Sequence, residues 1–238
     1  MKRLLLVTAM CLVAIAGVSN VASASYQVLY VNGILNLTEG MIGWGTTGNE
    51  MAGMSVFATF SDNTWESVAW IAEVPFAGRA SGTGWNLYEN GDTYTEEWSL
   101  SNLTGKTLKT LVIDAKPGNC VFDTEHNVGP DGYGTAGTFL GRAFNPRYAD
   151  QVDLTMTATY YDEVALDANP VPVGDIYRYL KIDFDGVGFA SGRALRYLAD
   201  TDELNHAGDL TPVPEPGSVL LTAAGILGLL AFRRRRRS

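Results

Sequence analysis

Short segments in which apolar and polar residues alternate recur along the middle of the chain, and turn-forming residues separate them. The clearest is 176–184, where Ile176, Leu180 and Ile182 share one face and Lys181 lies on the other. A period of two residues indicates a β-strand with one buried face. The same pattern predicts strands at 56–60, 64–71, 94–100, 107–115, 121–123, 152–166, 176–184 and 193–201, with a hairpin turn at 61–63.

No window of the chain indicates a long amphipathic helix, and no repeat of fixed period is visible. Many short strands in a domain of this size are typical of antiparallel sheets packed face to face. We therefore predict an all-β fold, an antiparallel β-sandwich of the jelly-roll kind, with a closed barrel as the alternative. The glycine-rich segment 129–141 is expected to form a long loop over one end of the sandwich.

The first 24 residues have the organisation of a secretory signal peptide, which we expect to be helical. Lys2 and Arg3 precede an apolar stretch at 4–18, and small residues at 22–24 predict cleavage between Ala24 and Ser25. A lipoprotein signal at Cys11 is disfavoured, because Met10 stands where such a signal needs a small residue. The sequence therefore predicts export of the rest of the chain.

The last 26 residues combine three chemically different parts. Pro214 and Pro216 flank Glu215, and they fix the backbone in an extended form that excludes helix. The uncharged stretch 218–232 has the character of a transmembrane helix, but its fifteen residues would span roughly 22 Å, less than the hydrocarbon core of a bilayer. The basic end of the chain predicts a cytoplasmic anchor, and it consists of Arg233, Arg234, Arg235, Arg236 and Arg237.

This succession resembles the PEP-CTERM sorting signal of exported proteins in Gram-negative bacteria. The resemblance implies that an exosortase, a membrane-embedded cysteine protease or transpeptidase, processes the chain at or near Pro214-Glu215-Pro216. It also implies transient anchoring in the inner membrane, final placement on the outer surface or in the extracellular matrix, and association with exopolysaccharide or biofilm. We accordingly divide the chain into a signal peptide at 1–24, an exported β-sandwich domain at 25–211 and a sorting signal at 212–238.

Two motifs of the exported domain resemble the bodies of uncharacterised PEP-CTERM proteins. The first is Phe122-Asp123 followed by the glycine-rich segment 129–141, and the second is Ala199-Asp200-Thr201-Asp202. This second resemblance implies a strand-rich domain and names no activity.

The exported domain is strongly acidic. The segment 25–211 contains 25 acidic and 10 basic residues, which gives a formal charge of −15. Such a domain repels nucleic acids and other anionic polymers, so we expect no nucleic-acid partner. The charge suits solubility outside the cell and the binding of divalent cations.

Motifs of known catalytic chemistry are missing from the sequence. His126 and His206 are the only histidines, and no zinc, P-loop, dinucleotide or serine-nucleophile signature occurs. Cys120 is the single cysteine of the exported domain, so we expect a buried apolar side chain rather than a nucleophile. We therefore predict a protein that is not an enzyme. The alternative is a β-sandwich glycosidase or lyase that uses a carboxylate pair, with candidates at Glu96/Glu97, Asp162/Glu163, Asp183/Asp185 and Asp200/Asp202.

Two further hypotheses concern ligands. Oxygen donors at strand ends suggest a structural calcium site, and its candidate ligands are Asp183, Asp185, Asp200 and Asp202. No other cofactor is expected. Trp44 and Trp85 lie between glycines or next to one, so they are the candidates for stacking against sugar rings, although packing into the core is the simpler use of both. The sequence thus predicts an exported, exosortase-processed surface or matrix protein. Glycan binding is one use of such a protein, and a structural matrix component without a small-molecule ligand is the other.

Overall fold

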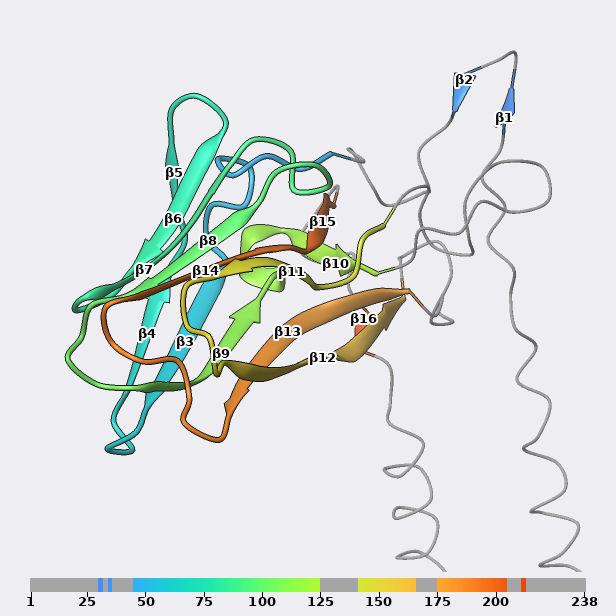
Figure 1. Ribbon diagram of the computed structural model, residues 1–238. Helices are drawn as coiled ribbons and strands as arrows, with labels where there is room; N and C mark the ends of the chain where they lie inside the picture. Colours follow the sequence, from blue (N-terminus) through green and yellow to red (C-terminus); the bar gives the residue numbers. More distant parts are fainter. Residues whose placement is uncertain are drawn as a thin grey trace, which may run out of the picture.

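The fold is built from two antiparallel β-sheets packed face to face (Figure 1). The computed structural model describes residues 30–31, 34–35, 45–124, 141–165, 175–204 and 211–212 of the 238-residue chain. The predicted β-sandwich is confirmed. Within the described segments no helix is long and apolar enough to cross a membrane. The signal peptide with its cleavage site, the expected helix at 218–232 and the arginine tail lie outside the described residues.

The larger sheet follows the order β15-β10-β13-β9-β3-β4, and β12 pairs with both β13 and β16. The two longest strands, β12 and β13, form an antiparallel pair on the side of this sheet away from β4 (Figure 1). The eight strands are β3 (Ser55–Phe60), β4 (Trp65–Ala69), β9 (Leu108–Asp114), β10 (Cys120–Asp123), β12 (Thr155–Ala165), β13 (Ile176–Asp185), β15 (Asp200–Glu203) and β16 (Thr211–Pro212).

The smaller sheet follows the order β11-β14-β8-β7-β6-β5, and the β5–β6 hairpin projects from one end (Figure 1). Its strands are β5 (Ile71–Glu73), β6 (Ala77–Ser81), β7 (Trp85–Asn90), β8 (Trp98–Asn102), β11 (Asn145–Ala149) and β14 (Arg193–Leu198). A separate pair, β1 (Tyr30–Val31) and β2 (Ile34–Leu35), and a short 3-10 helix η1 (Lys116–Gly118) complete the described elements.

The predicted hairpin at 61–63 is confirmed as the β3–β4 turn, with Asn63 in the left-handed conformation. The predicted single strand at 64–71 is wrong, because it divides at Trp70 into two strands of different sheets. The Trp70 side chain is buried, and its backbone N–H donates to the carbonyl of Met54 at 2.7 Å. This contact turns the chain from one sheet to the other.

A cluster of aromatic rings fills the centre of the core. The Trp98 ring lies 5.2 Å from that of Trp70 and stacks on Tyr197 at 6.1 Å between centroids. Its indole nitrogen donates to the carbonyl of Ala199 at 2.8 Å. All three rings are buried, so burial of the rings and this hydrogen bond both hold the sheets together.

We expect Trp98→Ala to lower the free energy of unfolding by roughly 3–5 kcal/mol, because it leaves a large cavity and an unpaired carbonyl on Ala199. Urea denaturation followed by circular dichroism would measure the change. Trp65→Ala is the matched control, since that ring is exposed and its loss should change stability by less than about 0.5 kcal/mol. Equal effects of the two substitutions would contradict the assignment of Trp98 to the core.

Candidate functional site

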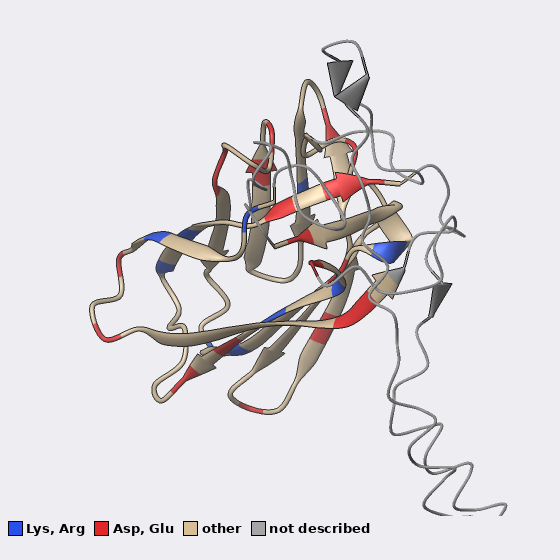
Figure 2. Cartoon of the chain, turned by 90° about the vertical axis from the view of Figure 1, so that its right-hand side faces the viewer, with Lys and Arg blue, Asp and Glu red and all other residues tan. Residues whose placement is uncertain are grey.

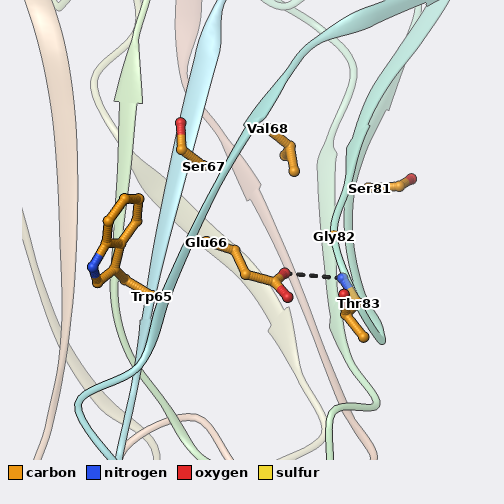
Figure 3. Close-up of a pocket in the computed structure, with 7 residues that line it drawn as sticks. All are labelled: Trp65, Glu66, Ser67, Val68, Ser81, Gly82 and Thr83. Atoms are coloured by element: carbon orange, nitrogen blue, oxygen red, sulfur yellow. Dashed lines mark hydrogen bonds between the residues drawn. The ribbon is translucent and has the colours of Figure 1, made fainter.

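A solvent-open groove runs between β4 and β6 at one edge of the sandwich (Figure 3). Its volume is about 590 Å³. We call it the edge groove, and its lining residues are Trp65, Glu66, Ser67, Val68, Ser81, Gly82 and Thr83. Most of these side chains are polar, so the groove suits a ligand rich in hydroxyl groups.

Strand β4 lies at the end of the larger sheet and pairs only with β3 among the described strands. Its side chains alternate: Trp65 and Ser67 are exposed, whereas Glu66 and Val68 are half-buried and face the smaller sheet. In Figure 3, Glu66 points toward Thr83 and Trp65 points away from it. The pleat of this edge strand therefore places the Trp65 ring and the Glu66 carboxylate on opposite sides of β4, and the carboxylate is the one that faces the groove.

The Glu66 carboxylate connects the two sheets. Its Oε2 accepts hydrogen bonds from the backbone N–H of Thr83 at 2.9 Å and from the indole N–H of Trp85 at 2.6 Å. Burial acts to raise the pKa of Glu66, but the bonds from Thr83 and Trp85 outweigh it and lower the pKa. Glu66 is therefore an ionised hydrogen-bond acceptor, and a proton donor at neutral pH would need the opposite shift.

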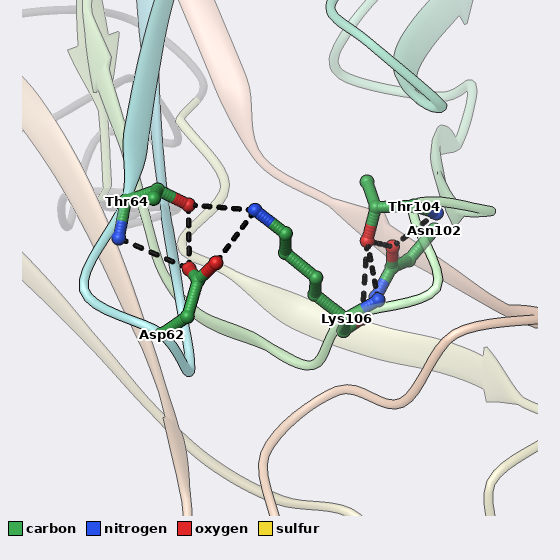
Figure 4. Close-up of polar contacts among 5 residues, drawn as sticks. All are labelled: Asp62, Thr64, Asn102, Thr104 and Lys106. Carbon is green, nitrogen blue, oxygen red and sulfur yellow. Dashed lines mark hydrogen bonds and ion pairs between the residues drawn. The ribbon is translucent and has the colours of Figure 1, made fainter.

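The turn beside Trp65 is fastened by a polar network (Figure 4). Lys106, in the loop between β8 and β9, forms an ion pair with Asp62 at 2.7 Å and donates to the hydroxyl of Thr64 at 3.0 Å. The hydrogen bond from Lys106, with those from Thr64, holds the pKa of Asp62 well below its usual range. In the same loop Thr104 donates to Asn102 at 2.8 Å. These bonds fix the entry to β4 and hence the position of Trp65.

The two tryptophans predicted to stack against sugars do not form an exposed pair. Trp85 is only 2% exposed and donates to Glu66, so its ring is not available for stacking. Trp44 lies outside the described residues. Among the tryptophans of the described segments, Trp65 is the exposed one, at 68%. A sequence signal could have identified Trp65: it alternates with Glu66 along a predicted strand, next to a predicted hairpin turn.

Further aromatic side chains lie on the outer face of the larger sheet, the face directed away from the smaller sheet. Phe57 on β3 is exposed like Trp65. On β12 and β13, Tyr161 stacks on Tyr179 with 4.6 Å between the centroids, and the Arg178 guanidinium lies 4.4 Å from the Tyr179 ring. Two aromatic groups thus lie on this face, Trp65 with Phe57 on β4 and β3, and the tyrosine pair on β12 and β13. Strand β9 lies between them.

The basic groups of the outer face are paired with carboxylates. Arg178 binds Asp114 through two hydrogen bonds of 2.8 and 2.6 Å, and Lys181 forms an ion pair with Asp183 at 2.7 Å. Because these charges are neutralised within the face, it has no excess positive charge to attract an anionic polymer. A neutral ligand is the better match.

The structure separates the four predicted calcium ligands into two pairs. Asp183 and Asp185 lie at the end of β13, where they bind Lys181 and Thr157. Asp200 and Asp202 lie on β15, which joins the sheet through β10 beside the start of β13. Seven residues of strand separate Asp183 from that point, about 23 Å. The four side chains therefore do not form one site.

Acidic residues are spread over the strands and turns of both sheets (Figure 2). Of the predicted carboxylate pairs, Glu97 lies near Arg196 and Asp162 near Arg178, both as surface ion pairs. The lining of the edge groove contains one carboxylate, that of Glu66. His126, His206 and most of 129–141 lie outside the described residues.

Asp200 and Asp202 are fully buried, like Glu89, Asp123 and Asp175. Burial, together with neighbouring Asp123, raises the pKa of Asp200 well above its ordinary value. Burial and the charge of Asp200 do the same to the pKa of Asp202. Cys120 is also buried, as predicted, and burial raises the pKa of its thiol.

The two sequence motifs that contain these aspartates lie side by side. Strand β10, which ends with Phe122-Asp123, pairs with β15 so that Asp123 is directly opposite Asp200 and Phe122 is opposite Thr201. Phe122 packs against the ring of Tyr160 at 5.7 Å. The described parts of the two motifs thus lie on paired strands of one sheet.

Comparison with protein families gives one match. Residues 212–237 match the PEP-CTERM protein-sorting motif. No curated protein and no solved structure matches the chain. The motif is that of an exported protein which is anchored transiently in the membrane and processed by an exosortase. The match begins at Pro212, the last residue of β16.

Proposed function

We propose that the chain is a non-enzymatic protein which, after processing by an exosortase, binds polysaccharide at the cell surface or in the extracellular matrix. The sorting motif at 212–237 is the observation that carries this proposal, because it directs the folded domain out of the cell. The domain that arrives there is acidic and built on a rigid sandwich. Its edge groove supplies the surface for the ligand.

Trp65 supports polysaccharide as the ligand. A large exposed ring on a rigid strand offers a flat apolar surface, and sugar rings have apolar faces that stack on it. Ser67 shares the exposed face of β4 with this ring, and on the other side of the strand the edge groove carries the hydroxyl groups of Ser81 and Thr83 and the ionised acceptor Glu66. Because β4 is the last strand of its sheet, a polymer that passes around this edge would combine stacking on Trp65 with hydrogen bonding in the groove.

Binding is favoured over catalysis by the carboxylates of the groove. Glycoside hydrolysis generally uses two carboxyl groups about 5–10 Å apart, one of which has a raised pKa and donates a proton. The groove lining contains Glu66 alone, and the pKa of Glu66 is lowered. This arrangement suits an acceptor for ligand hydroxyls.

We expect Trp65→Ala to weaken binding to the host exopolysaccharide roughly tenfold, because the main stacking surface is lost. The processed protein, isolated from the host, would be compared with the variant by affinity electrophoresis in gels that contain the polysaccharide. Ile71→Ala is the matched control: Ile71 is also apolar and 63% exposed, but it lies on β5 outside the groove.

Retention of both variants at wild-type strength would remove Trp65 from the binding surface. A wild-type protein that is retarded by no polysaccharide would contradict the binding function itself. Release of reducing sugar ends by the wild-type protein would favour a glycosidase instead.

A further inference from the structure

Two buried carboxylates on β15 have oxygens without any hydrogen-bond partner. Asp200 and Asp202 are 0% and 1% exposed, and they are two residues apart on one strand, so their side chains leave the same face. The Oδ1 of Asp200 accepts from the Thr93 hydroxyl and from the Thr201 N–H, both at 2.9 Å. The Oδ2 of Asp200 and the Oδ1 of Asp202 accept none.

No lysine or arginine of the exported domain forms an ion pair with these two carboxylates. All ten Lys and Arg residues of 25–211 belong to described segments, and none forms an ion pair with Asp200 or Asp202. Arg142 illustrates this, because its carbonyl accepts the N–H of Asp200 while its guanidinium lies over the Tyr94 ring at 4.2 Å. Ionised carboxylates buried without a positive partner are strongly unfavourable, so either a bound cation or a proton must neutralise them.

We propose that Asp200 and Asp202 bind one calcium ion. Two carboxylates neutralise the double charge, and calcium accepts hard oxygen ligands of mixed kind in a flexible arrangement. The hydroxyl of Thr93, already beside Asp200, is a third oxygen, and water completes the coordination. The described residues hold no group of three or more His, Cys, Asp or Glu side chains placed for a metal, so the site rests on two carboxylates and neutral oxygens.

The site connects three segments of the sandwich. Asp200 and Asp202 lie on β15, the last strand of the larger sheet, and β10 is its partner. Thr93 belongs to the turn between β7 and β8 of the smaller sheet. An ion there fastens the edge strand to both sheets, and the calcium concentrations found outside cells are sufficient for sites of this kind. This inference is independent of polysaccharide binding at the edge groove.

Thermal melting of the full chain in detergent tests the proposal. After treatment with EDTA at pH 7, 5 mM calcium chloride should raise the Tm by about 5 °C, whereas equal ionic strength from sodium chloride should not. Terbium should bind at the same place and emit on tryptophan excitation, because Trp98 hydrogen-bonds to Ala199, the residue before Asp200. Calcium should displace the terbium signal.

Asp202→Asn, which keeps the shape of the side chain, should abolish both the calcium shift and the terbium emission. Asp183→Asn is the matched control and should keep both, because Asp183 binds Lys181 on the outer face. An unchanged wild-type Tm on addition of calcium would overturn the proposal, as would a full response of Asp202→Asn. If acid stabilises the EDTA-treated protein and calcium does not, protons neutralise the carboxylates and the proposal fails. Should Asp202→Asn not fold, the wild-type melting and terbium data decide alone.

Discussion

Replacing Pro214, Glu215 and Pro216 together by alanine is expected to abolish processing and to leave the full-length chain in the membrane fraction. The two prolines restrict the backbone to an extended form and remove two N–H donors, so a protease receives a pre-organised peptide. Glu215 adds a charge between them. Alanine restores flexibility and removes this charge, and the matched motif at 212–237 loses its defining residues.

Fractionation of the host followed by immunoblotting and intact-mass measurement would follow the processing. Thr211→Ala is the matched control, since Thr211 precedes the matched motif and its strand pairing uses backbone groups. We expect this control to be processed normally. A triple variant that reaches the same final location with the same mass as the wild type would show that the motif is not the processing signal.

Raising the pH from 4.5 toward 9 is expected to destabilise the domain, and the buried Glu89 contributes to this loss of stability. Its side chain is fully buried on β7, against the backbone of Gly48. Burial, and then the charges of Asp92 and Glu96, raise the pKa of Glu89 to about 9 from an ordinary 4.5. The folded state therefore keeps a proton that the unfolded chain releases above pH 4.5.

The sign follows from this proton. The contribution of Glu89 to stability is fully present below pH 4.5 and is lost as the pH rises through about 9. In that window the free energy of unfolding should fall by about 1.4 kcal/mol for each pH unit from this group alone. Glu89→Gln cannot ionise, so its unfolding free energy should depend much less on pH, and it should be the more stable protein at pH 8.

Urea denaturation at several pH values would measure both slopes. Glu73→Gln is the matched control, because Glu73 is a surface residue paired with Arg79 and its replacement should leave the wild-type slope unchanged. Parallel slopes for the wild type and Glu89→Gln would mean that Glu89 is ionised in the folded protein.

The strands that sequence patterns predicted are those with large apolar residues at alternate positions, such as β3 and β13. The β6–β7 hairpin was missed because β6 contains no large apolar residue: apart from Arg79, its residues are small. The position of β6 depends on a tertiary contact: the Gly78 backbone packs so closely that a side chain there would collide with the Trp70 indole and the carbonyl of Gly48. β-strand propensity does not identify a strand whose position depends on such a close contact of its backbone with neighbouring groups.

The candidate site was less predictable than the fold. Glycine beside Trp85 suggested an exposed loop, whereas Trp85 opens a strand and reaches inward to Glu66. Trp65 was expected within a strand, but exposure on an edge strand depends on what covers it, which is a tertiary property. The motif with Asp200 and Asp202 was recognised in the sequence, yet strands of acidic residues usually indicate a solvated surface, and only the pairing with β10 shows their burial.

Because β16 pairs with the end of β12, only a very short linker separates the folded domain from the Pro214-Glu215-Pro216 motif. Pro212 is paired with Val164, and Pro214 follows two residues later, a reach of at most roughly 7 Å. An exosortase that binds Pro214 would therefore also contact the surface of the β-sandwich. Either the active-site entrance of the exosortase accommodates the edge strand β12, or β16 must first dissociate from β12. In both cases the structure of the folded domain affects how readily the chain is released from the membrane.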